Sequence, residues 1–277
     1  MTRPAEEDLH AMGIEEVTEP VDDSMLLCVD IGNTNTVLAV FEGERLAHSW
    51  RTRTDPHATA DELGLTFRAL LEGNGVDLTG IALSSTVPQQ AAEVARMAQR
   101  YYPHAHFVAI APGVRTGVRL SIDNPKEAGP DRIANTHAAY HMYGGPCITV
   151  DFGTSTNIDV ISAQGDFLGG AFAPGIEISI DALASRAANL LKIPLVKPRN
   201  VIGKNTVECL QSGMVYGTAA QVDGLVKRIT EELEAAPTAV VATGGLAPMV
   251  IEQCETVTHY EPNLTLHGLR MIFARNT

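Results

Sequence analysis

The sequence predicts an α/β protein made of two similar domains that face each other across a ligand-binding cleft. Two heptapeptides support this prediction: DIGNTNT, from Asp30 to Thr36, and DFGTSTN, from Asp151 to Asn157. Each follows an apolar run typical of a buried strand, and each contains Asp, a Gly two residues later and a cluster of Thr and Asn. Polar turns follow both segments at a similar distance, and internal duplication is the simplest explanation of these shared features.

The duplicated segment has the chemistry of a phosphate clamp. A single D-x-G-x-T is also a common hairpin turn, and one copy alone would not indicate function. Gly32 and Gly153 lack a Cβ, so backbone N–H groups can approach an anion while the threonines add hydroxyl donors. Asp30 and Asp151 stand at strand ends, where a carboxylate can hold a hard cation beside the phosphates.

The first half alternates strands with helices, as expected of an α/β domain. Pro88 occupies the first position of a helix, where proline is tolerated. In chain order we expect strands over 25–29, 36–41 and 46–51, a helix over 59–71, a strand over 81–84, a helix over 88–101, a strand over 106–110 and a helix over 127–143.

The second half repeats this plan. Asn205 and Glu208 have the spacing of a helix N-cap and its third residue, so a long helix begins there. We expect strands over 148–151, 157–162 and 167–172, helices over 177–190 and from 205 toward 234, a strand over 239–243, a short helix after the turn GGLAP and a helix from 264. The predicted domains are therefore 25–143 and 144–277, preceded by an acidic tail, 1–24, that we expect to be disordered.

Composition and charge exclude several classes of protein. With 277 residues, of which 45% are hydrophobic, the chain can bury one large core or two similar ones. The net charge of −13 argues against nucleic acid as a partner, because such binding needs a basic surface. No apolar stretch approaches the roughly 20 residues that cross a membrane, and no secretion-signal pattern is present. We therefore expect a cytoplasmic protein without a membrane partner.

Other residues that often indicate chemistry have ordinary explanations here. The four cysteines are far apart in the sequence, and small core residues explain them better than disulfide bonds or zinc. His137 and His141 share a helix face, but Ala138 stands where a zinc protease needs Glu. The chain contains no P-loop, G-x-G-x-x-G or G-x-S-x-G motif.

A second charged motif, GPDR, covers Gly129 to Arg132. Asp131 and Arg132 fall near a helix N-terminus, where the helix dipole keeps a carboxylate ionised and free N–H groups can bind an anion. A helix cap with a surface arginine explains the spacing equally well. Likewise, ATGGLAP, from Ala242 to Pro248, allows either close approach of a flat ligand such as a nucleotide base or a plain turn.

The segments DIGNTNT, NPKEAGPDR, DFGTSTN, GGAFAPG, GKNTVE and ATGGLAP, in this order, resemble those of the type III pantothenate kinases. The resemblance covers nearly all of 25–275. It implies two duplicated ribonuclease-H-like domains, the fold of the actin, sugar-kinase and Hsp70 ATPases. It also implies phosphorylation of pantothenate to 4′-phosphopantothenate, the first step of coenzyme A synthesis, by a homodimer that uses ATP with Mg²⁺ and a monovalent cation, K⁺ or NH₄⁺.

The resemblance further implies roles for individual residues. Asp131 would be the general base, Arg132 would face the carboxylate of pantothenate, and Asp151 would bind the monovalent cation. Thr206 would reach pantothenate across the dimer interface. The ATP phosphates would lie against Asp30, Ile31, Gly32, Asn33, Thr34, Asn35, Thr36, Val37 and Thr154. Pantothenate would lie against Gly129, Pro130, Asp131, Arg132 and Thr206.

The chain departs from the family pattern at a few positions, with Ile122 where Tyr is common and Pro130 where Ala is usual. Two alternatives to an active pantothenate kinase therefore stay open. One is a regulatory protein that binds nucleotide or pantothenate without turnover, and the other is a kinase for a different hydroxylated acid. Retention of Asp30, Asp131, Arg132 and Asp151 favours the enzyme.

Overall fold

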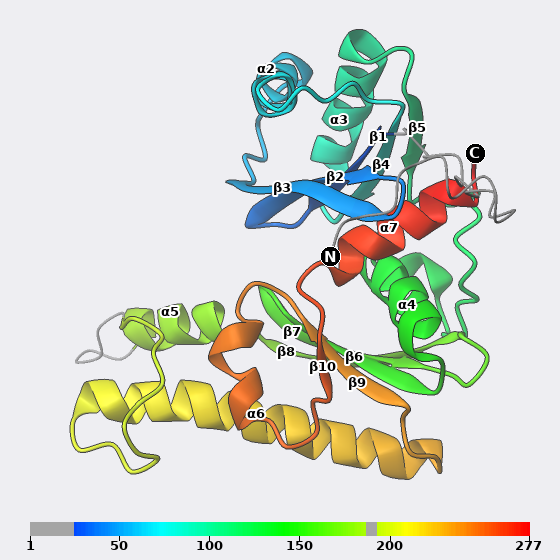
Figure 1. Cartoon of the computed structure of the whole chain (residues 1–277). Helices are drawn as coiled ribbons and strands as arrows, with labels where there is room; N and C mark the ends of the chain where they lie inside the picture. Colours follow the sequence, from blue (N-terminus) through cyan, green and yellow to red (C-terminus); the bar gives the residue numbers. More distant parts are fainter. Residues whose placement is uncertain (1–24, 187–192) are drawn as a thin grey trace, which may run out of the picture.

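The computed structural model describes residues 25–186 and 193–277, and it consists of two stacked α/β halves (Figure 1). The predicted acidic tail, 1–24, and the end of the helix predicted over 177–190 lie outside the described residues. Each half contains one five-stranded mixed sheet.

The sheet of the first half has the strand order β3-β2-β1-β4-β5. β1 pairs antiparallel with β2 and parallel with β4. The strands are β1 (Met25–Ile31), β2 (Asn35–Glu42), β3 (Arg45–Arg53), β4 (Gly80–Ser85) and β5 (His106–Ala109). The helices are α2 (Ala60–Glu72), α3 (Pro88–Tyr101) and α4 (Pro130–Tyr143).

The sheet of the second half repeats this arrangement in the order β8-β7-β6-β9-β10. β6 pairs antiparallel with β7 and parallel with β9. The strands are β6 (Cys147–Phe152), β7 (Ser155–Ile161), β8 (Phe167–Pro174), β9 (Ala239–Thr243) and β10 (His259–Tyr260). The helices are α5 (Ile176–Arg186), α6 (Thr206–Leu233) and α7 (Leu264–Ala274). The matching order and directions confirm the predicted duplication.

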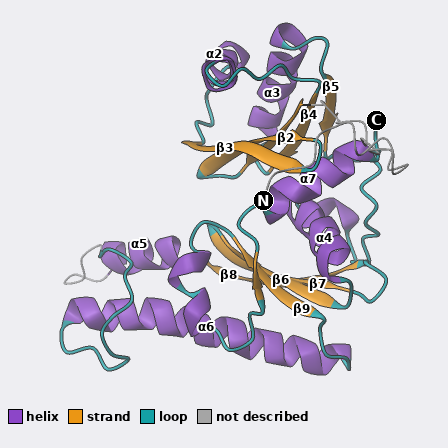
Figure 2. Cartoon of the chain, viewed as in Figure 1, coloured by secondary structure: helices purple, strands orange, loops and turns teal. Residues whose placement is uncertain are grey.

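α4 and α7 lie between the two sheets, and the other helices cover the outer faces of the sheets (Figure 1, Figure 2). α2 and α3 cover the outer face of the first sheet, and α5 and α6 cover that of the second. Between the sheets, α7 packs on the first sheet through Leu266 and Leu269, while α4 packs on the second through Ala138 and Ala139. Each half therefore contributes a helix that covers the sheet of the other half.

The alternation of β1 directs Asp30 toward the space between the sheets, since successive side chains of a strand point to opposite faces. Leu27 and Val29 pack with the residues of α2 and α3. Leu26 and Cys28 pack with the residues of α7 on the other face. Asp30 continues this second series, so its carboxylate belongs to the inner face.

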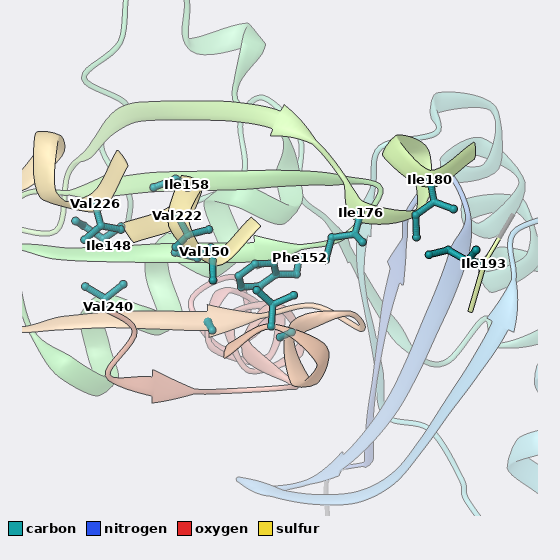
Figure 3. Packing of buried hydrophobic residues seen from close by; sticks show 14 residues of the cluster. Ile148, Val150, Phe152, Ile158, Ile176, Ile180, Ile193, Val222, Val226 and Val240 are labelled. Carbon is teal, nitrogen blue, oxygen red and sulfur yellow. The ribbon is translucent and has the colours of Figure 1, made fainter. Parts of the chain in front are cut away.

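β6 places Asp151 in the same way. Ile148, Val150 and Phe152 pack into the core formed with α5 and α6 (Figure 3). Cys147, of the opposite series, packs against α4. Asp151 belongs to that series and therefore points to the inner face of its own sheet.

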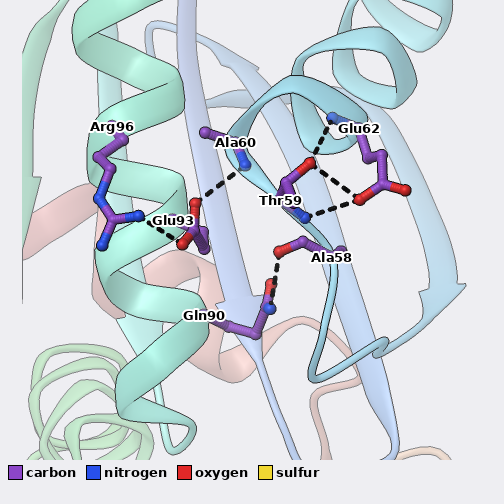
Figure 4. Close-up of polar contacts among 7 residues, drawn as sticks. All are labelled: Ala58, Thr59, Ala60, Glu62, Gln90, Glu93 and Arg96. Atoms are coloured by element: carbon purple, nitrogen blue, oxygen red, sulfur yellow. Dashed lines mark hydrogen bonds and ion pairs between the residues drawn. The ribbon is translucent and has the colours of Figure 1, made fainter.

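Local signals fix the ends of several helices. Thr59 caps α2: Glu62 Oε2 accepts from the Thr59 N–H at 2.8 Å, and Thr59 Oγ1 accepts from the Glu62 N–H (Figure 4). Gln90 of α3 donates to the Ala58 carbonyl at 3.0 Å and so ties α3 to the segment just before α2 (Figure 4). Asn205 caps α6 through the Glu208 N–H, as the sequence predicts.

A few boundaries differ from the prediction. The helix expected from 127 begins instead at Pro130 with Gly129 as its N-cap, and Pro125–Glu127 forms a separate 3₁₀ turn. Proline at the first helical position explains the later start, because it cannot donate an N–H inside a helix. The short helix expected after GGLAP is a pair of 3₁₀ turns, Ala247–Met249 and Ile251–Gln253.

Candidate active site

A cleft of about 730 Å³ lies between the two halves. Its walls come from the ends of β1 and β6, the turns that follow them, the N-terminus of α4 and the turn after β9. The carboxyl ends of parallel strands are where open α/β sheets commonly bind ligands. Asp30 and Asp151 both line this single cleft, as the duplicated motif predicts.

The turns of the two heptapeptides meet in the cleft. The N–H groups of Gly32 and Gly153 each donate to a carbonyl within their own turn, at 2.9 and 3.0 Å. The hydroxyl oxygens of Thr34 and Thr154, which are 120 residues apart in the chain, lie 3.1 Å from each other. The first turn is one residue longer than the second, because Ile31 pairs with Thr36 whereas Phe152 pairs with Thr156. The two hairpins nevertheless bring a threonine hydroxyl from each half to one point.

Strand register places equivalent residues of the two halves in matching rows. Directly opposite residues on neighbouring strands project from the same face of a sheet. In the first sheet the row is Ser84, Asp30, Val37 and Arg51, and in the second it is Thr243, Asp151, Asn157 and Phe172. The duplication therefore extends from the hairpins to the positions around them, although the side chains at the last two positions of each row differ.

Three carboxylates, those of Asp30, Asp131 and Asp151, share the cleft. Burial, assisted by the negative charge of Asp131, raises the pKa of Asp30 and that of Asp151 to about 7. Burial also raises the pKa of Asp131, whose Oδ1 is buried without a hydrogen-bond partner in the described part of the chain. This concentration of negative charge suits a bound cation.

The Asp131 carboxylate depends on the glycine before it for space. Asp131 lies in the first turn of α4, two residues after the N-cap Gly129. A Cβ at Gly129 would lie 2.4 Å from Asp131 Oδ1, far inside van der Waals contact. The GPDR motif therefore uses glycine to seat the carboxylate at the helix N-terminus.

Arg132 is held beside Asp131 by a buried partner that the sequence analysis did not single out. Its Nε and Nη2 donate to Asp159 Oδ1 at 2.9 and 2.5 Å, and Asp159 is 1% exposed. The guanidinium lies 4.8 Å from the ring centroid of Phe167 and 4.4 Å from that of Phe172. Burial raises the pKa of Asp159 to about 6 despite the charge of Arg132. The alternative of a surface arginine is therefore wrong.

Most residues expected to hold ATP phosphates come together in the cleft. Those that line it are Asp30, Gly32, Asn33, Thr34, Asn35, Val37 and Thr154. Ile31 instead belongs to the core beneath α2 and α3. Thr36 is buried, and its hydroxyl lies 2.9 Å from that of Thr54, so it supports the hairpin from behind.

The residues expected to hold pantothenate divide into two groups. Gly129, Asp131 and Arg132 line the cleft, whereas Pro130 does not. Thr206 is exposed at the start of α6, outside the cleft of its own chain.

Arg51 and Phe172 line the cleft and were not predicted, and neither was Asp159, the buried partner of Arg132. An acid between Ile158 and Val160 in a strand is a signal for Asp159, because a charge on a buried face needs a partner. Arg51 and Phe172 carry no such local signal. They become visible only when the register of each sheet is known.

The donor set fits a cation that a nucleotide helps to hold. Among residues 25–186 and 193–277 there is no group of three or more His, Cys, Asp or Glu side chains that could hold a metal ion. Mg²⁺ in kinases is commonly held by one or two carboxylates together with substrate phosphates. The raised pKa of Asp30 and that of Asp151 fit such shared coordination, because each carboxylate is buried beside other negative charge.

Comparison with solved structures defines the class of protein. The ethanolamine utilization protein EutJ from Carboxydothermus hydrogenoformans aligns with a TM-score of 0.54 and 15% identity, covering 96% of each chain. The ROK family glucokinase from Streptomyces griseus, in complex with glucose and AMPPNP, aligns with a TM-score of 0.50 and 14% identity, covering 92% of this chain and 100% of the glucokinase. The fold is therefore that of the sugar kinases and actin-like ATPases, duplicated as the sequence predicts.

Sequence comparison defines the family. A family model described as type III pantothenate kinase matches residues 26–228. The type III pantothenate kinase of Salinispora arenicola is 63% identical over 252 residues, covering 91% of this chain and 100% of the relative. That of Rhodococcus erythropolis is 55% identical over 259 residues, covering 91% of this chain and 96% of the relative. The chain belongs to the type III pantothenate kinase family.

Proposed function

We propose that this protein uses ATP to phosphorylate pantothenate to 4′-phosphopantothenate, the first step of coenzyme A synthesis. The observation that carries the proposal is the meeting of the two hairpins, with Thr34 Oγ1 3.1 Å from Thr154 Oγ1, beside the three carboxylates of the cleft. Family membership supports pantothenate as the acceptor.

The hairpins bind the phosphates of ATP through hydroxyl and backbone donors. Because the chain has no P-loop lysine, these donors leave part of the phosphate charge uncompensated. Mg²⁺ held with Asp30, and K⁺ or NH₄⁺ held with Asp151, would supply positive charge that stabilises the transferring phosphoryl group. The pKa of both carboxylates falls when such cations bind, so both are then ionised at neutral pH.

Asp131 receives the proton of the pantothenate hydroxyl. An alcohol is far too weak an acid for a carboxylate to deprotonate it fully before transfer, so Asp131 orients the hydroxyl and accepts its proton late in the reaction. Its unpaired buried Oδ1 is the acceptor atom that this role needs. Alignment and charge therefore account for most of the rate acceleration.

Arg132 binds the carboxylate of pantothenate. Asp159 Oδ1 accepts hydrogen bonds from the Nε–H and from one N–H of Nη2 of Arg132. The remaining N–H donors of the planar guanidinium are left for a substrate. Phe167 and Phe172 hold the guanidinium plane, so the Arg132 side chain is oriented before the substrate arrives. Gly129 contributes by giving the neighbouring Asp131 carboxylate its space.

We further propose a homodimer, formed at the exposed edge of the second sheet. β8 is the edge strand there. Large apolar side chains are exposed on β8, on α5 and around the start of α6: Leu168, Phe172, Ile178, Val201, Ile202 and Val207. Thr206 stands among them, outside its own cleft, so dimerisation at this surface would bring the partner's Thr206 toward pantothenate.

The cytoplasm is the proposed place of the reaction. All four cysteines are free, and Cys28 and Cys147 are buried in strands, which suits a reducing compartment. No helix within the described residues is long and apolar enough to cross a membrane.

A product assay tests the proposal. Purified protein is incubated with ATP, Mg²⁺ and pantothenate in K⁺ or in Na⁺, beside Asp131→Asn and a control, Asp77→Asn, whose side chain is 99% exposed. We expect 4′-phosphopantothenate in K⁺, much less in Na⁺, and a rate about a hundredfold lower in Asp131→Asn, since general-base catalysis contributes factors of that order. The control should match the wild type.

The alternatives give different results in the same assay. Nucleotide binding without product in either salt would favour the regulatory protein. Product from another hydroxylated acid, but not from pantothenate, would favour a kinase of different specificity.

A further inference from the structure

Arg51 of β3 is a cation in the cleft that no role above uses. Among the residues that the structure describes, the cleft is lined by two arginines, Arg51 and Arg132, and by no lysine. Arg132 is paired with Asp159. Within residues 25–186 and 193–277, the Arg51 guanidinium has no hydrogen bond or ion pair with another side chain. Its charge is therefore available to a ligand.

Register places Arg51 beside the phosphate hairpin. Arg51 lies opposite Val37, which lies opposite Asp30, so the three side chains project from one face of the sheet. With strands about 4.8 Å apart, Arg51 stands roughly 10 Å from Asp30 across the sheet. The charge of Arg51 acts on Asp30 and Tyr260, since it lowers the pKa of each against the larger effect of burial.

Arg51 also reaches the second half of the molecule. A Cβ at Gly245 would lie 2.4 Å from Arg51 Nη1 and 2.9 Å from Nη2. The guanidinium therefore rests on the backbone of the ATGGLAP turn, which continues β9 beside Asp151. Arg51 thus stands between the first hairpin and this turn, on the path that a nucleotide would follow along the cleft.

The counterpart of Arg51 in the duplicated sheet has a different side chain. Phe172 occupies the equivalent position in its row and covers the guanidinium of Arg132. Within the described part of the chain, the remaining charged groups of the cleft are acidic: Asp30, Asp131, Asp151, Glu127 and Glu177. A polyphosphate that binds in this acidic cleft needs a compensating positive charge. At the matching position of the two rows, the first sheet supplies the cation Arg51, whereas the second sheet has Phe172.

We propose that Arg51 binds the phosphate chain of the nucleotide, between the first hairpin and the Gly244-Gly245 turn, and so makes the site selective for nucleotides over nucleosides. This inference rests on the proposed function, because it requires ATP to bind in this cleft. A planar guanidinium can donate two parallel N–H bonds to phosphate oxygens, a geometry that Gln cannot reproduce. The competing explanation is a clamp that holds the two halves together.

Nucleotide affinity tests the proposal without requiring turnover. Calorimetric titration gives the Kd of ATP, ADP and adenosine for the wild type, Arg51→Gln and a matched control, Arg53→Gln. Arg53 is an exposed arginine of the same strand that does not line the cleft. We expect Arg51→Gln to raise the Kd of ATP and ADP by about tenfold to a hundredfold, as for a lost charge-assisted contact, and to leave that of adenosine unchanged. Arg53→Gln should leave all three unchanged.

A second variant tests the contact with the turn. Gly245→Ala places a methyl group where the Arg51 guanidinium lies, so it should weaken ADP binding in the wild type and have no added effect in Arg51→Gln. Equal effects of Gly245→Ala in both backgrounds would overturn the proposal. So would an unchanged ADP affinity in Arg51→Gln, or an equal loss of adenosine and ADP affinity together with a lower melting temperature, which is the result expected of a clamp.

Failure of the proposed function and failure of the proposed role of Arg51 would give different results. A wild type that binds no ATP, or phosphorylates no pantothenate, contradicts the proposed function. A wild type that does both, while Arg51→Gln retains its ADP affinity, contradicts the role of Arg51 alone.

Discussion

Gly129 shows how the absence of a Cβ can position the side chain of a neighbouring residue, here the cleft carboxylate of Asp131. Its backbone angles, φ −62° and ψ 145°, are open to any residue, so conformational freedom does not explain the glycine. The explanation is the Asp131 carboxylate, whose Oδ1 would lie 2.4 Å from a Cβ at this position. Gly129 therefore fixes where Asp131 lies at the N-terminus of α4.

Gly129→Ala should lower kcat without unfolding the protein. The added methyl group must displace the Asp131 carboxylate, and a shift of about 1 Å in a reacting group can cost up to a hundredfold in rate. We expect kcat to fall by at least about tenfold while the melting temperature stays within a few degrees. Steady-state kinetics and thermal unfolding measure the two quantities.

Gly213→Ala is the matched control for that substitution. Gly213 lies in α6, and a Cβ there would have no atom within 4 Å. This variant should keep the wild-type kcat. A Gly129→Ala enzyme with wild-type kcat would show that Asp131 does not need its observed position.

At the scale of single residues, the sequence predicted the cleft residues that stand in a recognisable motif and missed those that do not. Asp30, Asp131 and Asp151 stand in motifs whose chemistry can be stated from neighbouring residues. Arg51 lies on an exposed strand of ordinary composition, and its role depends on a strand pairing and on a turn in the other half. Neither the strand pairing nor the contact with the turn can be inferred from the residues next to Arg51 in the sequence.

At the scale of elements, α4 and α7 form the layer that joins the two sheets. A Cβ at Gly268 of α7 would lie 2.1 Å from the Ala134 carbonyl oxygen, so the helices cross in direct contact. Thr265 Oγ1 also donates to Asn135 Oδ1 at 2.8 Å. Because α4 contacts helices and strands on several sides, seven consecutive residues, Ile133–Ala139, are buried.

The same layer contains a histidine that folding keeps neutral. Burial, together with the positive charges of His141 and Arg275, lowers the pKa of His137 from 6.5 to about 4. The His137 ring lies 4.3 Å from that of His141, and its edge approaches the backbone at Gly117. Protonation of His137 is therefore unfavourable in the folded protein.

Acid should weaken the contribution of His137 to the stability of the fold. The unfolded chain takes up this proton below about pH 6.5 and the folded protein only near pH 4, so the contribution of His137 is full above pH 6.5 and falls between these values. Allowing for solvent near the ring, we expect that contribution to the free energy of unfolding to fall by about 2 kcal/mol. The raised pKa values of Asp30, Asp151 and Asp159 act in the opposite direction over this range, so denaturant titrations at several pH values measure the difference between the wild type and His137→Gln.

His137→Gln should remove that contribution, so between pH 6.5 and pH 4 acid should lower the stability of this variant less, or raise it more, than that of the wild type. The exposed His57 offers a control, since His57→Gln removes a histidine outside the helix layer and should keep the wild-type slope. An identical slope in His137→Gln and the wild type would assign the acid sensitivity to other groups.

Elements with local start and stop signals, and strands with a clear apolar run, were predicted well, whereas the shortest strand was not. The caps at Thr59 and Asn205 set the beginnings of α2 and α6 as the sequence predicts. β10 was missed because its two residues, His259 and Tyr260, form a strand only by pairing with β9. A strand of that length has no periodicity to detect.

At the scale of the whole molecule, the two halves exchange their covering helices. α7 belongs to the second half by sequence but covers the first sheet, and α4 belongs to the first half but covers the second. The motif repeat predicted two similar sheets correctly. It could not predict the exchange, because the pattern of a helix shows which face is apolar and not which sheet covers that face. The boundary between 143 and 144 stays a prediction.

This exchange predicts that the first half is unstable when cut at that boundary. A fragment of residues 25–143 lacks α7 and exposes the inner apolar face of its sheet, including Leu26, Cys28 and Phe41, which are buried in the whole chain. A domain that loses one covering layer loses much of its hydrophobic stabilisation, while the entropy cost of ordering the chain remains. We expect the fragment to unfold at lower denaturant concentration than a fusion in which a flexible linker joins 25–143 to 263–277, as measured by circular dichroism.

Addition of the separate fragment 144–277 should restore the stability as well, because it supplies α7 together with the sheet that covers α4. If 25–143 alone has the same unfolding midpoint as the fusion, α7 is dispensable to the first sheet and the halves are independent domains.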